Sequence, residues 1–199
     1  MGIPPNRNRV TPLSPGSTGL GARDYILNMS VKDTSAESQH IIAIKVANSF
    51  NALSRIAGLF SGRGFSIDSI SIGDCEQDKM ARGTITTHGD VRIIEQITRQ
   101  LDKLVDIESV DDLTYSPHVA RELALIKVKA PMETRAEIIQ VANIFRSKII
   151  DISPKSVTIE ITGNSNKVDA AIGMFRPFGL IEVARTGLVA LRREYNGEV

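Results

Sequence analysis

The residues best placed to do chemistry are short polar side chains at the start of a predicted helix. Asn48, Ser49 and Asn51 follow a run of alternating apolar residues and precede an amphipathic stretch. The first turn of a helix exposes unpaired backbone N–H groups and a partial positive charge, so it attracts a carboxylate. Asparagine and serine are also ordinary helix caps. This polar group therefore either caps the helix or orients a bound amino acid, and the residue types leave both alternatives open.

No convergent catalytic constellation accompanies this polar group. The three histidines, His40, His88 and His118, fall in different predicted elements, and Cys75 lies in a polar turn without a neighbouring base. The stretch GLFSGRGFS is rich in glycine but lacks the Gly-Lys-Ser/Thr ending of a phosphate-binding loop. We therefore expect a binding protein with no catalytic residues, no metal ligands and no cofactor of its own.

The spacing of apolar residues predicts the strands and helices that position these residues. Ile42, Ile44 and Val46 alternate as in a strand, whereas Leu53, Ile56, Leu59 and Phe60 recur at helical spacing. Continued along the chain, this pattern predicts strands and helices at 40–47 (strand), 52–62 (helix), 65–73 (strand), 81–89 (strand), 90–104 (helix, with Asp90 as its cap) and 105–115 (strand).

A second, looser copy of the same order follows a short link at Ser116 to His118. It predicts a strand at 122–130, a helix at 132–148, strands at 149–153 and 156–163, a helix at 165–178 and a last strand at 180–193. Strand, helix, strand, strand, helix, strand is the order of the ferredoxin-like fold. The fold class is therefore α+β, with two βαββαβ domains at 39–115 and 116–199. Residues 1–38, rich in Pro, Gly, Ser and Asn, are expected to form a mostly disordered N-terminal extension.

Composition excludes several classes of function. The chain has 199 residues, a net charge of +1 and 42% hydrophobic residues, which is ordinary for a soluble protein that binds neither nucleic acid nor membranes. A single cysteine and the lack of a signal-peptide core fit a cytoplasmic protein. RNA-recognition domains share this topology, but they stack bases on aromatic residues of two strands. The corresponding strands here, HIIAIKVA and ARGTITTHG, contain no Phe, Tyr or Trp.

Several blocks resemble one family in the right order. ALSRIAGLFSGRGFSIDSI, EQITRQLDKLVDI, RELALIKVKA, IFRSKIIDISP, GNSNKVDA and EVARTGLVAL are similar to the regulatory (small) subunit of acetohydroxyacid synthase, also called acetolactate synthase. The resemblance covers about residues 40–193. It implies that the first domain is an ACT domain, an amino-acid-sensing module.

The resemblance implies a non-catalytic protein that associates with a large catalytic subunit and raises its activity. It also implies feedback inhibition by a branched-chain amino acid, usually valine, within valine, leucine and isoleucine biosynthesis. Thiamine diphosphate, Mg and FAD are expected in the catalytic subunit. Family members form homodimers through their ACT domains, and the effector binds at that interface.

Carried over position by position, the resemblance assigns the effector site to Asn48, Ser49, Asn51, Ala52, Leu53, Ser66 and Ile67. Two positions depart from the family pattern. Asn51 stands where the family usually has glycine, and Ser66 where it has asparagine. We expect these changes to weaken valine binding, because Asn51 could cap the helix with its own side chain and Ser66 is shorter.

Two other functions fit the same residues. The chain could be a free-standing amino-acid-sensing ACT protein that serves another enzyme, or an oligomerisation module without a ligand. Association with a large thiamine-diphosphate synthase separates the first interpretation from both alternatives, and amino-acid binding separates a sensor from a scaffold.

Overall fold

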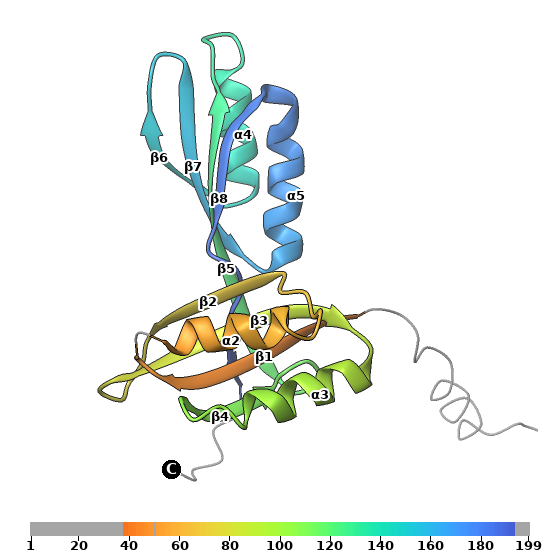
Figure 1. Cartoon of the computed structure of the whole chain (residues 1–199). Coiled ribbons are helices and arrows are strands. Elements are labelled where there is room, and N and C mark those ends of the chain that lie inside the picture. Colours follow the sequence, from red (N-terminus) through yellow and green to blue (C-terminus); the bar gives the residue numbers. More distant parts are fainter. Residues whose placement is uncertain (1–37, 50, 194–199) are drawn as a thin grey trace, which may run out of the picture. The chain divides into compact units, whose positions relative to one another are not determined.

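The structure, a computed structural model, describes residues 38–49 and 51–193, which lie within one compact unit and build two antiparallel sheets (Figure 1). The expected extension at 1–38 falls outside the described residues, except for Ser38. The boundaries of the two predicted domains, 39–115 and 116–199, stay predictions. No helix in the described part of the chain is long and apolar enough to cross a membrane.

The first sheet has the strand order β2-β3-β1-β4, and two helices cover one of its faces (Figure 1). Its elements are β1 (Ser38–Ala47), α2 (Ala52–Ser61), β2 (Ser69–Asp74), β3 (Met80–Gly89), α3 (Val91–Leu101) and β4 (Ile107–Asp112). This is the predicted order of one ferredoxin-like unit.

Alternation along β1 decides which face the helices cover. Ile42, Ile44 and Val46 are all buried, as predicted, and pack against Ile56 and Phe60 of α2 in one apolar cluster. Helix α3 adds Ile94, Ile97 and Leu101 to that cluster. The predicted cap is present, because the Asp90 carboxylate accepts a hydrogen bond from the Ile93 N–H at 2.8 Å.

The second sheet repeats this arrangement with the order β6-β7-β5-β8 and helices α4 and α5 on one face (Figure 1). Its elements are β5 (His118–Lys129), α4 (Arg135–Ile144), β6 (Lys148–Ile152), β7 (Ser156–Gly163), α5 (Ser165–Phe175), a short 3₁₀ helix η1 (Arg176–Phe178), β8 (Leu180–Arg185) and β9 (Val189–Arg192). Together the two sheets confirm the predicted α+β fold.

The predicted single strand at 180–193 is wrong, because the chain breaks at Gly187 into β8 and β9. Gly187 has a φ of +76°, in the left-handed region that favours glycine. Beyond it, β9 pairs with His118–Arg121, the first part of β5. The N–H of Ala190 also donates to Thr84 Oγ1 on β3 at 3.1 Å. The C-terminal strand therefore joins the second sheet to the helix-free face of the first.

The predicted strand at 65–73 is also too long, since β2 begins only at Ser69. The segment before it turns after Gly64, which has a φ of +72°. Ser66 and Ile67 consequently lie in the loop that leads into β2, and this placement matters for the site described below.

We predict that Gly187→Ala lowers the melting temperature more than Gly64→Ala does. Both substitutions put a side chain at positive φ, which costs about 1–2 kcal/mol. Only at residue 187 does the added Cβ also meet a neighbour, the Ser69 Cβ at 3.0 Å, whereas residue 64 faces open space. With about 2–4 °C per kcal/mol, we expect a modest decrease for Gly64→Ala and a clearly larger one for Gly187→Ala in calorimetry. Equal decreases would show that the Ser69 contact contributes nothing.

Candidate functional site

The polar group singled out in the sequence lies in the loop between β1 and α2. The Asn48 N–H donates to the Lys79 carbonyl at 2.8 Å, and its side-chain amide donates to Asp74 Oδ1 at 3.0 Å. Ser49 Oγ donates to Asp106 Oδ1 at 3.3 Å. Both side chains are exposed. The loop is thus tied to the end of β2, to the turn before β3 and to the loop before β4.

Asn51 precedes α2 but does not cap it with its side chain. The expectation that the Asn51 side chain accepts hydrogen bonds from the N–H groups of the first turn is therefore wrong. Its neighbours divide between core and surface. Ala52 is buried, whereas Leu53, predicted to lie on the buried stripe, is 52% exposed. The exposed Leu53 side chain thus lies beside a helix start that has no side-chain cap and carries a partial positive charge.

Ser66 and Ile67 occupy the other end of α2. The Ser66 carbonyl accepts a hydrogen bond from Thr87 Oγ1 at 2.6 Å, and its side chain is exposed. Ile67 is half-buried and packs on the apolar cluster beneath the helices. The loop is therefore anchored to the far end of β3.

The two groups of predicted site residues do not meet within one chain. Asn48 is bonded to Lys79, just before β3 begins, and Ser66 is bonded to Thr87, near the end of the same strand. From Met80 to Thr87 an extended strand spans about 23 Å. A free amino acid is much shorter than this distance, so it cannot contact both groups in a single chain.

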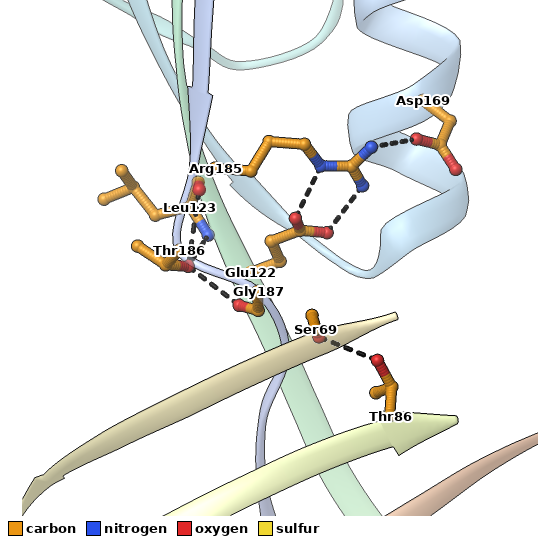
Figure 2. Close-up of polar contacts among 8 residues, drawn as sticks. All are labelled: Ser69, Thr86, Glu122, Leu123, Asp169, Arg185, Thr186 and Gly187. Atoms are coloured by element: carbon orange, nitrogen blue, oxygen red, sulfur yellow. Dashed lines mark hydrogen bonds and ion pairs between the residues drawn. The ribbon is translucent and has the colours of Figure 1, made fainter. Parts of the chain in front are cut away.

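A separate polar cavity of about 450 Å³ opens next to Ser69, where β2 begins. Figure 2 shows its main feature, the guanidinium of Arg185 between two carboxylates. Arg185 donates from Nε and Nη2 to the two oxygens of Glu122 at 2.6 and 2.8 Å, and from Nη1 to Asp169 at 2.7 Å. The hydrogen bonds to Glu122 raise the pKa of Arg185 above its usual value. Because Glu122 is buried, replacing Arg185 alone would leave an unpaired buried carboxylate and destabilise the fold.

This cavity suits an amino-acid carboxylate poorly. Its lining contains three carboxylates, those of Asp68, Glu122 and Asp169, against the single cation of Arg185. Two of those carboxylates already bind that cation. The cavity is therefore better understood as the polar junction below Gly187, where Ser69 also bonds Thr86 at 2.7 Å (Figure 2).

Sequence reasoning missed this ion cluster, although one signal pointed to it. Glu122 shares its face of β5 with Ala124, Ile126 and Val128, all fully buried. A carboxylate at the start of such an apolar alternation needs a cation in the fold. The identity of that cation, Arg185, depends on the pairing of β5 with β8, in which Ala124 lies opposite Arg185.

The histidines and the cysteine stay apart in the structure. His40 is buried and bonds Ser38, Thr114 and the Gly89 carbonyl, whereas His88 pairs with Asp68 and His118 bonds the Ser116 carbonyl. Cys75 Sγ donates a weak hydrogen bond to the Gln77 carbonyl at 3.8 Å. Across residues 38–49 and 51–193, no cluster of His, Cys, Asp or Glu could hold a metal ion.

Two family models match the chain over its two sheets. The model described as "Small subunit of acetolactate synthase" matches residues 121–194, and "AHAS small subunit-like ACT domain" matches residues 42–109. The ACT domain expected in the first half is thus confirmed.

Individual relatives agree with these models. The acetolactate synthase small subunit of Aquifex aeolicus (strain VF5) is 47% identical over 157 residues, which cover 78% of this chain and 82% of that protein. The probable acetolactate synthase small subunit of Methanothermobacter thermautotrophicus is 49% identical over 155 residues, 77% of this chain and 92% of that protein. The acetolactate synthase small subunit from Thermotoga maritima, known from a crystal structure, is 40% identical in sequence. The match covers 79% of this chain and 99% of the Thermotoga chain, with a TM-score of 0.74. The chain therefore belongs to the family of acetolactate synthase small subunits.

Proposed function

We propose that the chain is the regulatory subunit of acetolactate synthase, without catalytic activity of its own. It binds the large catalytic subunit, raises that subunit's activity and makes it sensitive to a branched-chain amino acid, most simply valine. Thiamine diphosphate, Mg and FAD belong to the catalytic subunit in this proposal. The observation that carries it is the family match, which extends over both sheets.

The effector site in this proposal is composite, with Asn48, Ser49, Asn51, Ala52 and Leu53 from one copy and Ser66 and Ile67 from a second. The free edge of β2 supports this arrangement, because in the described chain β2 pairs only with β3. Two such edges can pair antiparallel around a twofold axis, which satisfies their unpaired backbone groups.

Antiparallel pairing of two β2 strands sets the beginning of one beside the end of the other. Asp74 ends β2 and binds the Asn48 side chain, whereas Ser66 lies three residues before the strand begins at Ser69. The dimer therefore brings Asn48 of one copy next to Ser66 of the other. The two loops are about 23 Å apart within one chain, but they lie close together when each comes from a different copy.

The chemistry of this composite site fits an amino acid with an apolar side chain. Asp74 and the Asn48 carbonyl oxygen can accept from the ammonium group, and the uncapped first turn of α2 can receive the carboxylate. Leu53 and Ile67 offer apolar surface to the side chain, because neither is fully buried.

We predict that the purified chain forms no acetolactate from pyruvate, that adding it to the catalytic subunit increases acetolactate formation, and that valine reverses this increase. The measurement is acetolactate formation by the catalytic subunit, with and without the chain, across a valine titration. Acetolactate formation by the chain alone, free of contaminating synthase, contradicts the non-catalytic role. Stimulation that valine does not reverse contradicts the proposed feedback role of valine but leaves the partnership with the catalytic subunit intact.

We further predict that Asn51→Gly combined with Ser66→Asn strengthens valine binding. Removing the Cβ at residue 51 opens the helix start to the carboxylate, and the longer amide at residue 66 can add a hydrogen bond to the ligand. One such bond contributes about 0.5–1.5 kcal/mol, or up to about tenfold in affinity. Calorimetry on the double variant and on each single variant separates the two effects. Unchanged or weaker valine binding by the double variant would show that these two positions act differently.

A further inference from the structure

Helix α2 has a second exposed surface, distinct from the effector loop at its start. Arg55, Gly58 and Leu59 of α2 share one face of the helix, and Gly62 and Arg63 of the turn after it continue this surface. This face forms one wall of a shallow groove of about 700 Å³. The opposite wall comes from the end of α3 and the turn after it, with Gln100, Lys103 and Leu104. We call this surface the α2–α3 groove.

The middle of the groove is bare backbone at Gly58. Glycine is unfavourable inside a helix compared with almost any other residue. The described residues leave room for a side chain here, because an added Cβ at residue 58 would meet none of their atoms within 4 Å. Gly58 is also exposed and has no unusual dihedral angle recorded. Without a side chain, this position leaves the helix backbone open to close approach by another molecule.

The rim of the groove carries more positive charge than the described residues of the chain neutralise. Arg55 pairs with Asp106 at 2.8 Å. Arg63 bonds only the neutral amide of Gln100, at 3.0 Å, and neither it nor Lys103 forms an ion pair with any described residue. The chain as a whole carries only +1, so this is a local excess of cations.

We propose that the α2–α3 groove docks an acidic segment of the catalytic subunit. The inference rests on the proposed function, which supplies that partner, and it adds the contact surface and its chemistry. Half-buried Leu59 and Leu104 provide an apolar floor, Gly58 gives room for the partner's backbone, and Arg63 and Lys103 pair with its carboxylates. Arginine at the edge of an apolar patch is typical of protein interfaces.

The extent of the groove favours a protein segment over a small anion. From Arg55 to its end at Ser61 the helix rises about 9 Å, and Arg63 extends the groove further, so the groove is longer than a phosphate or a single carboxylate. The same helix also begins at the effector loop. A ligand bound at that loop and a partner docked on the groove therefore contact one rigid element, which gives effector binding a direct route to the partner.

The test is Gly58→Gln, which fills the groove with an uncharged residue that favours helices. We expect the melting temperature of the chain to stay the same or to rise by a few degrees. The concentration of chain needed for half-maximal stimulation of acetolactate formation should increase at least tenfold. The matched control is Gly173→Gln in α5, an exposed helical glycine whose added Cβ also meets nothing within 4 Å. This control should leave the half-maximal concentration unchanged.

A second variant tests the charge. Arg63→Glu with Lys103→Glu should also weaken stimulation at least tenfold, and raising the salt concentration should weaken the wild-type complex more than the variant complex. An unchanged half-maximal concentration for Gly58→Gln overturns the inference. So does dissociation of the homodimer by Gly58→Gln in light scattering, because the groove would then be a contact between copies. Competition of wild-type stimulation by inorganic phosphate at low salt, without any effect of Gly58→Gln, assigns the groove to a free anion and equally overturns it. If the wild-type chain itself does not stimulate the catalytic subunit, the proposed function fails instead.

Discussion

The pairing of β3 with its two neighbours is the constraint on which the rest of the structure depends. β3 lies between β1 and β2, and it pairs with β1 along its whole length, from Met80 opposite Ala47 to Gly89 opposite Ser38. This register holds the loop at Asn48 at one end of the strand. It also holds the loop at Ser66 at the other, through Thr87. Residues that the family resemblance groups into one site are thus kept apart in each chain. A site that uses all of them needs a second copy, and the unpaired edge of β2 is where that copy can add.

Helix α2 lies at the centre of the proposed regulation because it links three surfaces. In the proposal its start receives the effector and its exposed face contributes Gly58 to the docking groove, while its end leads through Gly64 to Ser66. The helix is held by Ile56 and Phe60, both almost fully buried, so it responds as one rigid body. A few residues after Ser66, Ser69 lines the same polar cavity as Gly187 and Arg185, which lie between β8 and β9 and at the end of β8. The loop at Ser66 therefore lies only three residues from Ser69, which shares this cavity with residues of the second sheet.

Local pattern predicted most of the elements, because alternation and helical spacing reflect burial against one core. Ile42, Ile44 and Val46 lie on the buried face of β1, and Asp90 caps α3 as its residue type suggested. The failures occur where distant segments decide the conformation. The break at Gly187 depends on β9 reaching Thr84 on β3, and no local pattern in 180–193 encodes that contact. Exposure of Leu53 likewise depends on where the sheet and α3 end, although its spacing matches the buried residues. Of the candidate site, Asn48, Ser49 and Asn51 were indicated by their residue types and the other residues by a resemblance. Their separation along β3 follows only from the pairing of strands.

The central claim is that the effector site is shared between two copies. It is tested most directly by a mixed dimer in which one chain carries Asn51→Phe and the other Ser66→Phe, isolated through two different affinity tags. Both positions are exposed, so each bulky side chain blocks its own half of a site without disturbing the core. Valine binding is then measured by calorimetry on the mixed dimer and on each uniform variant. A shared site predicts that neither uniform variant binds valine, whereas the mixed dimer keeps one intact site with wild-type affinity and half the wild-type stoichiometry. Absence of valine binding by the mixed dimer, with two sites in the wild type, would contradict the shared site.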